Sequence, residues 1–197
     1  MLEHLKTYFG FDRFLPLQEE IISRVLCKKD AMVLMPTGGG KSLCYQLPAV
    51  LFSGVTLVVS PLIALMKDQV DGLLAHGIAA GFINSSLSAS QINRVQQMAR
   101  DGVFKILYVA PERLALPGFK DFLGSVDVSL FAIDEAHCIS EWGHEFRPDY
   151  RNLRTLRQDF PTVPIVALTA TATVQTATAP CRDRESITVA AVALQKK

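Results

Sequence analysis

The chain has few cysteines, and their spacing argues against two kinds of stabilising site. Four cysteines occur in 197 residues, with no Cys-x-x-Cys pair and no zinc-ligand spacing to the four histidines. Neither a disulfide framework nor a structural zinc site is therefore indicated. We expect the cysteines to be reduced, mostly buried thiols of an intracellular protein; they are Cys27, Cys44, Cys138 and Cys181.

Long apolar runs and a strong net charge are also absent. No apolar stretch reaches the ~18 residues that a membrane span needs, and the N-terminus has no apolar signal-peptide core. The formal charge of +1 provides no general attraction to nucleic acid or membrane, so any basic surface must be local. The length fits one domain, and 49% hydrophobic residues suffice for a packed core. We expect a soluble protein, cytoplasmic in a bacterium or nuclear in a eukaryote.

Short apolar runs alternate with amphipathic segments along the chain. Runs rich in Val, Ile and Leu predict strands at 31–35, 55–60, 80–84, 105–109, 130–134 and 164–168. Helical patterns lie at 16–27, 42–52, 62–76, 89–100, 119–123 and 149–159. Pro16 suits the first turn of its helix, and Gly77 suits a C-terminal cap. This alternation predicts an α/β fold with a mostly parallel sheet covered by helices on both faces, which binds ligands beyond the carboxyl ends of its strands.

The stretch 35–42, Met-Pro-Thr-Gly-Gly-Gly-Lys-Ser, lies between a predicted strand and a predicted helix. Glycines let backbone N–H groups converge on phosphate oxygens, and the helix N-terminus adds partial positive charge. The pattern predicts a nucleoside triphosphate site, with Lys41 on the β- and γ-phosphates and the Ser42 hydroxyl on Mg²⁺. Met35 stands where the strict pattern has glycine, and a purely structural turn is the alternative. The other expected loop contacts are Thr37, Gly38, Gly39 and Gly40.

Asp134 and Glu135 directly follow an apolar strand. A strand that ends in an acidic residue is typical of ATPases that hold Mg²⁺ opposite a phosphate loop. We expect Asp134 to hold the ion through water at a neighbouring strand end, and Glu135 to orient and deprotonate the attacking water. His137 suits a link between the nucleotide and other groups. Adjacent carboxylates are often only solvated charge, and the phosphate loop favours the catalytic interpretation.

Five segments occur in the order of superfamily-two helicase motifs, at 35–42, 58–69, 108–114, 134–137 and 167–173. The stretch 138–148, Cys-Ile-Ser-Glu-Trp-Gly-His-Glu-Phe-Arg-Pro, resembles the aromatic-rich loop of the RecQ DNA helicases. Such helicases hydrolyse ATP to move 3′ to 5′ along single-stranded DNA and separate duplexes. The resemblance implies a three-layer RecA-like P-loop domain over residues 1–173, with ATP and Mg²⁺ as cofactors and single-stranded or duplex DNA as partner.

The same resemblance assigns residues 9–18 to adenine recognition. Gln18 has an amide that can both donate to and accept from the adenine edge, and Phe11 would stack on the ring. The family usually has arginine where this chain has Leu15, which removes one contact. An exposed helix residue without a ligand is the alternative for Gln18.

Several residues would meet DNA if the resemblance holds. Bases stack on aromatic faces and arginine neutralises phosphate, which suits Trp142, His144, Phe146 and Arg147 in the loop after the carboxylates. A buried structural role is the alternative for the single tryptophan. The family usually has aspartate at Glu145. Backbone contacts are expected from Ser60, Lys67 and Arg113. Thr169 and Thr171 would hydrogen-bond to the carboxylate segment and relay nucleotide state, or simply cap a strand end.

Residues 174–197 do not align with the family and form a divergent tail. The second helicase lobe, which carries an arginine finger, is expected to be missing from this chain. Because such a finger raises the rate by roughly 10³–10⁵, these 197 residues should hydrolyse ATP slowly by themselves. Two alternatives remain open. One is an RNA helicase lobe of the Asp-Glu-Ala-His type, and the other is a fragment that binds nucleotide or DNA without catalysis.

Overall fold

The computed structural model describes residues 1–139 and 153–170. Its strands are β1 (Ala31–Leu34), β2 (Val55–Val59), β3 (Ala80–Ile83), β4 (Ile106–Val109), β5 (Val128–Ile133) and β6 (Ile165–Thr169). Its helices are α1 (Leu2–Phe9), α2 (Gln18–Leu26), α3 (Leu43–Leu51), α4 (Ile63–Ala75), α5 (Ala89–Arg100), α6 (Phe119–Gly124) and α8 (Leu153–Asp159). Short 3₁₀ turns lie at Pro111–Ala115 and Ala136–Ile139.

The strands form one sheet in the order β1-β6-β5-β2-β4-β3, and every pairing is parallel. Leu34 at the end of β1 lies opposite Thr169 of β6, and Ile133 at the end of β5 lies opposite Val59 of β2. All the carboxyl ends therefore meet at one edge. In parallel sheets of this kind, that edge is where ligands bind.

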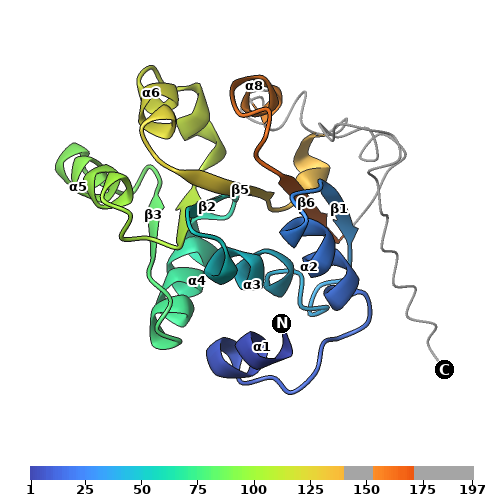
Figure 1. The fold of residues 1–197 in the computed structure, drawn as a ribbon. Coiled ribbons are helices and arrows are strands. Elements are labelled where there is room, and N and C mark those ends of the chain that lie inside the picture. The colour runs from blue at the N-terminus through green and yellow to red at the C-terminus, as the bar shows by residue number, and fades with distance from the viewer. Residues whose placement is uncertain (140–152, 171–197) are drawn as a thin grey trace.

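Helices cover both faces of the sheet (Figure 1). Helices α2, α3 and α4 bury their apolar sides on one face, and α5, α6 and α8 bury theirs on the other. Helix α1 packs against α2 and α3, where Leu5 lies with Ile22 of α2 and with Leu43 and Leu47 of α3. This three-layer α/β arrangement confirms the predicted fold class. No helix within residues 1–139 or 153–170 has the length and apolar character needed to cross a membrane.

The predicted strands and helices are all found, with boundaries that differ by up to two residues at most ends. The helix expected at 149–159 is described from Leu153 onward. Gly77 follows the last residues of α4 with φ of 72°, as a glycine cap predicts. The placement of Pro16 inside α2 was wrong, because Leu17 has φ of 69° and the helix begins only at Gln18. Helix α1 was not predicted.

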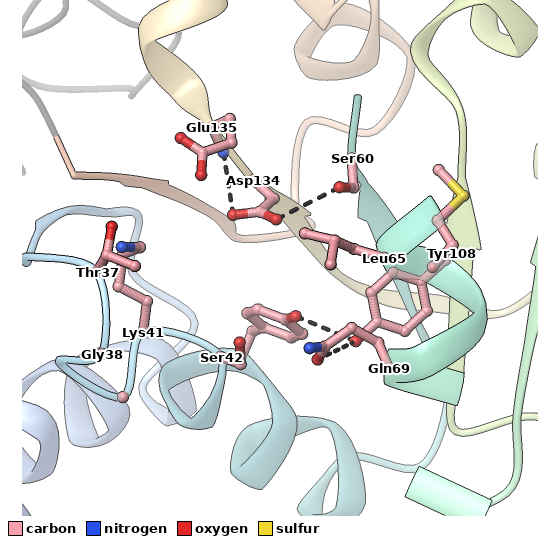
Figure 2. Close-up of a pocket in the computed structure, with 13 residues that line it drawn as sticks. Thr37, Gly38, Lys41, Ser42, Ser60, Leu65, Gln69, Tyr108, Asp134 and Glu135 are labelled. Carbon is pink, nitrogen blue, oxygen red and sulfur yellow. Dashed lines mark hydrogen bonds between the residues drawn. The ribbon is translucent and has the colours of Figure 1, made fainter. Parts of the chain in front are cut away.

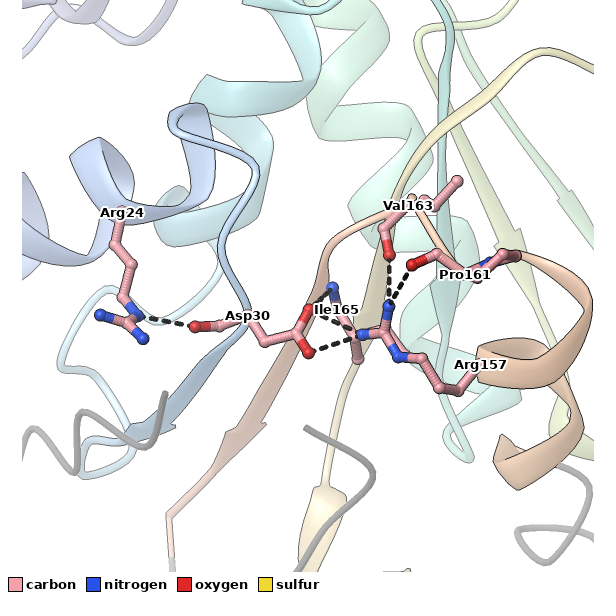
Figure 3. Close-up of polar contacts among 6 residues, drawn as sticks. All are labelled: Arg24, Asp30, Arg157, Pro161, Val163 and Ile165. Atoms are coloured by element: carbon pink, nitrogen blue, oxygen red, sulfur yellow. Dashed lines mark hydrogen bonds and ion pairs between the residues drawn. The ribbon is translucent and has the colours of Figure 1, made fainter. Parts of the chain in front are cut away.

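A buried ion pair joins α8 to the start of β1 at the amino end of the sheet (Figure 3). The Arg157 guanidinium donates to both carboxylate oxygens of Asp30, at 2.7 and 2.6 Å, and the backbone N–H of Ile165 donates to the same carboxylate at 2.9 Å. Arg157 also donates to the carbonyl of Val163, and Arg24 donates to the Asp30 carbonyl. One carboxylate therefore ties the beginning of β1 to the beginning of β6.

Candidate active site

The phosphate loop follows β1 directly. Gly38 and Gly40 have φ of 80° and 76°, the left-handed region that disfavours residues with a Cβ. Met35 needs no such freedom, because its backbone φ is not positive, and its side chain is buried in the core between the sheet and helices α2–α4. This packing explains why methionine is accommodated where the strict pattern has glycine.

The Lys41 side chain folds back onto the backbone of the phosphate loop. Its ammonium donates to the backbone carbonyls of Met35 at 3.1 Å and Pro36 at 3.3 Å. The loop thus holds a half-buried positive charge at the N-terminus of α3. A phosphate that enters the loop would meet this charge in place of the two carbonyls.

The two carboxylates begin where β5 ends. The backbone N–H of Asp134 still donates to Val59 of β2, at 2.8 Å, which fixes its position. Its carboxylate accepts from the Glu135 N–H at 3.0 Å and from the Ser60 hydroxyl at 3.4 Å. Burial raises the pKa of Asp134, and the charge of Glu135 raises it further, while these hydrogen bonds and Lys41 act in the opposite direction.

One cavity of about 370 Å³ brings these groups together. Figure 2 shows the phosphate loop on one side of it and Asp134 with Glu135 on the other. The expectation that Lys41 and Asp134 extend from neighbouring strands was wrong, because β6 lies between β1 and β5. Strand order depends on how each crossover packs, which local sequence does not reveal. The cavity is lined by Thr37, Gly38, Gly40, Lys41, Ser42, Tyr45, Ser60, Leu65, Met66, Gln69, Tyr108, Asp134 and Glu135.

The cavity fits a Mg²⁺ ion held jointly by protein and nucleotide. The Ser42 hydroxyl and the Asp134 carboxylate both line it, and both offer the oxygen ligands that Mg²⁺ prefers. No group of three or more His, Cys, Asp or Glu side chains suited to a metal occurs among the described residues. Mg²⁺ commonly binds one or two protein groups together with phosphate oxygens and water.

His137 stands between Glu135 and β6. Its Nδ1 atom lies 3.2 Å from a carboxylate oxygen of Glu135 and 3.2 Å from the hydroxyl of Thr169, which is fully buried. The imidazole therefore contacts both the predicted water-activating carboxylate and the last residue of a neighbouring strand. Thr169 meets the carboxylate segment through His137.

Gln18 is buried, with only 2% of its surface exposed, so the exposed-helix alternative is wrong. Its amide nitrogen donates to the Gly40 carbonyl at 3.0 Å, and its oxygen accepts from the Leu15 N–H at 2.8 Å. In this structure the side chain braces the phosphate loop. Phe11 is 56% exposed, and Leu15 is also exposed.

The predicted DNA contacts fall into three groups. Ser60 is only 3% exposed and donates to Asp134, so it belongs to the cavity rather than to an outer DNA-binding surface. Arg113 donates to the Asn84 carbonyl at 2.8 Å, while Lys67 is exposed on α4 and pairs with Asp71. The remaining predicted residues, Trp142, His144, Phe146, Arg147 and Thr171, lie outside the described residues.

Three polar residues of the cavity were not predicted from the sequence: Tyr45, Tyr108 and Gln69. Tyr45 lies three positions after Ser42, and this spacing places both on one face of a helix, which is the only local signal. Tyr108 and Gln69 come from β4 and α4, and only the fold brings them to the same place.

Replacing Gly40 with alanine should weaken nucleotide binding in addition to lowering the stability of the fold. A Cβ there would lie 2.4 Å from Nε2 of Gln18, at a backbone φ of 76°. Gly102 is a matched control, because its φ is 70° and a Cβ would meet nothing within 4 Å. Both changes should cost about 1–2 kcal/mol of stability from the left-handed backbone. Only Gly40→Ala should also lower the affinity for a fluorescent ATP analogue. Equal affinities of the Gly40→Ala and Gly102→Ala variants would contradict this prediction.

Comparison with known proteins identifies helicases that are similar to this chain. A family model described as DEAD/DEAH box helicase matches residues 15–179. Over 171 residues the chain is 53% identical to the ATP-dependent DNA helicase RecQ of Pasteurella multocida (strain Pm70), covering 87% of this chain and 27% of that protein. It is 50% identical over 171 residues to RecQ of Bacillus subtilis (strain 168), covering 86% and 29%. The chain thus spans less than a third of these relatives.

Solved structures show the same fold at lower sequence identity. The DUF1998 helicase MrfA bound to DNA and AMPPNP matches with a TM-score of 0.72 and 19% identity, over 88% of this chain and 26% of that chain. A hypothetical ATP-dependent RNA helicase from Sulfolobus tokodaii matches with a TM-score of 0.67 and 22% identity, over 89% and 53%. At such identities the likeness concerns the fold alone. Since the family model spans most of the length of this chain, the chain belongs to the DEAD/DEAH box helicase family.

Proposed function

We propose that this lobe serves a 3′-to-5′ DNA helicase, which couples ATP hydrolysis to movement along single-stranded DNA and to duplex separation. The observation that carries the proposal is the single cavity that joins Lys41 and Ser42 with Asp134 and Glu135. About half of the aligned residues are identical to those of DNA helicases named RecQ, which supports DNA as the partner.

The residues divide the chemistry of phosphoryl transfer among them. Lys41 would neutralise charge on the β- and γ-phosphates, and the N–H groups of the loop would hold their oxygens. Mg²⁺, when bound, would offset the charge that develops on the phosphates; Ser42 would bind it directly and Asp134 would hold it through water. Glu135 would orient the attacking water and accept its proton, and His137 would hold that carboxylate toward the cavity through their contact of 3.2 Å.

Adenine recognition would depend on Gln18 and Phe11. The amide of Gln18 retains one N–H and one lone pair beyond its bonds to Leu15 and Gly40. We infer that these remaining positions read the base, with Phe11 stacking on it from its exposed position. The same side chain would then report a bound base to the phosphate loop through Gly40.

Binding of DNA would affect the two carboxylates through the polypeptide chain that connects them to the aromatic stretch. The aromatic stretch 138–148 begins three residues after Glu135, so bases stacked on Trp142 or Phe146 would act on the catalytic segment through a short covalent path. Lys67, which is exposed on α4, would add a contact to the DNA backbone.

ATP turnover by a two-lobed protein that contains this chain should rise with single-stranded DNA and much less with RNA of the same sequence. The 197-residue chain alone should bind ATP but displace no DNA strand, because an arginine finger worth roughly 10³–10⁵ in rate is expected from the second lobe. Steady-state ATPase and strand-displacement assays measure both. Equal stimulation by RNA would favour an RNA helicase, and ATP binding without any stimulated turnover would favour a non-catalytic module.

A further inference from the structure

Two hydrogen-bonded routes lead from helix α3 to one atom on helix α4. Gln46 of α3 donates to the side-chain oxygen of Gln69 on α4 at 3.2 Å. The Tyr108 hydroxyl of β4 donates to the same oxygen at 3.5 Å, and it lies 3.1 Å from the hydroxyl of Tyr45 of α3 (Figure 2). A tyrosine hydroxyl has one proton, and Tyr108 gives its proton to Gln69, so Tyr45 donates to Tyr108. Both routes therefore begin at neighbouring residues of α3 and end on Gln69.

The same two residues of α3 also hold the end of the phosphate loop. The backbone N–H groups of Tyr45 and Gln46 donate to the carbonyl of Ser42, at 3.2 and 2.9 Å. A triphosphate that draws Lys41 away from its carbonyl partners would rearrange the loop that Ser42 ends. Because a helix transmits displacement as a rigid element, that rearrangement would reach Tyr45 and Gln46 in the first turn of α3.

Helix α4 presents the proposed DNA contact close to Gln69. Lys67 lies two positions before Gln69, and residues with this spacing on a helix do not face the same way. Accordingly, Gln69 lines the cavity, whereas Lys67 is exposed and pairs with Asp71. The bonds that hold Gln69 therefore also fix the part of α4 that carries Lys67.

The bond between Tyr108 and Gln69 is sensitive to small movements. Its length of 3.5 Å exceeds the usual O–H···O distance of about 2.7–2.8 Å, so a slight displacement of α3 or α4 would shorten or break it. Tyr45 and Tyr108 are 2% and 1% exposed, so their hydroxyls depend on these partners rather than on bulk water. An apolar contact would tolerate the same displacement, because it has no preferred direction.

We propose that Gln69 is a positioning residue that couples the nucleotide cavity to DNA binding: nucleotide tightens the bonds from α3 to Gln69, and these set the position of Lys67 on α4. The inference rests on the proposed function, in which the cavity binds ATP and Lys67 contacts the DNA backbone. It adds a route that is separate from the stretch 138–148. The coupling is reciprocal, so DNA changes nucleotide affinity by the same factor as nucleotide changes DNA affinity.

The test measures how many-fold single-stranded DNA raises the affinity of a two-lobed protein containing this chain for a fluorescent, non-hydrolysable ATP analogue. Couplings of this kind are typically about 5–150-fold. Gln69→Met keeps the length of the side chain but removes the shared acceptor, and it should reduce the ratio by about threefold to tenfold. Each variant is compared with itself, so a loss of nucleotide affinity that is common to both conditions cancels.

A control glutamine lies on the other face of the sheet. Gln97 of α5 donates to Asp101 at 2.9 Å, and Gln97→Met should leave the ratio as it is in the unaltered protein. Gln46→Met removes only one of the two routes, so it should reduce the ratio less than Gln69→Met does. It also provides a second test if Gln69→Met folds poorly.

A double variant tests whether the coupling passes through Lys67. Lys67→Ala should reduce the ratio by itself, because it removes the DNA contact that α4 positions. Adding Gln69→Met to Lys67→Ala should then reduce the ratio much less than Gln69→Met does alone. A purely structural role of Gln69 would give the same reduction in both backgrounds.

The outcomes distinguish this inference from the proposed function. An unchanged ratio in both Gln69→Met and Gln46→Met would overturn the role of Gln69 alone, as would an equal reduction by Gln97→Met or equal effects of Gln69→Met with and without Lys67. Turnover stimulated by DNA with no DNA effect on nucleotide affinity in the unaltered protein would do the same. Absence of both effects would instead overturn the proposed function and this inference with it.

Discussion

Replacing Lys41 with alanine is expected to lower DNA-stimulated ATP turnover by about 10²–10³-fold in a two-lobed protein that contains this lobe. Lys41 is the cation of the phosphate loop, and it lines the same cavity as Asp134 and Glu135. Without it, charge that develops on the transferred phosphoryl group loses its nearest protein counterion. Steady-state ATPase measured at saturating single-stranded DNA gives the change in rate.

The structure offers a closely matched control lysine. The ammonium of Lys105 also donates to two backbone carbonyls, those of Phe52 at 2.7 Å and Ser53 at 3.5 Å. It lies just before β4, at the amino edge of the sheet and away from the cavity. Lys105→Ala should therefore leave turnover nearly unchanged. Similar losses from the two substitutions would show that Lys41 supports the fold rather than the reaction.

The largest effect on stability is expected at the ion pair between Asp30 and Arg157. Arg157→Ala should lower the free energy of unfolding by about 3–5 kcal/mol, because it removes a guanidinium that pairs with a buried carboxylate. The Asp30 side chain is only 5% exposed and receives two hydrogen bonds from Arg157, at 2.7 and 2.6 Å. The bond from Ile165 remains in the variant, but it carries no full charge. Urea-induced unfolding followed by circular dichroism measures the difference.

An exposed ion pair on the same helix serves as the control. Lys120 pairs with Asp159 of α8 at 2.6 Å, but the lysine side chain is 70% exposed. Lys120→Ala should cost about 0–1 kcal/mol, since solvent screens such pairs. Replacing both Asp30 and Arg157 with leucine should recover part of the loss from Arg157→Ala. Equal costs for Arg157→Ala and Lys120→Ala would show that burial does not strengthen the Asp30 pair.

The phosphate loop and the carboxylate pair were predictable because each is a local feature. Residues 35–42 contain the turn, the lysine and the hydroxyl within one contiguous stretch, and Asp134 and Glu135 directly follow an apolar run. The strands were predictable for the same reason, since runs of Val, Ile and Leu indicate burial on both faces.

Other parts of the site depend on segments far apart in the chain. Gln18 contacts Gly40 across 22 positions, and Ser60 contacts Asp134 across 74, so neither bond is visible in a sequence window. Helix α1 also escaped prediction, because its place depends on the packing of Leu5 against α2 and α3.

The sequence by itself determined which groups carry the chemistry: a glycine-rich loop with its cation, and two carboxylates at a strand end. Tertiary structure alone decided that β6 separates the strands carrying them, that Ser60 faces the cavity, and that two tyrosines and Gln69 complete its inner wall. The physical reason is that local stereochemistry fixes what one segment can bind, whereas packing of helices on both faces of the sheet fixes which segments meet.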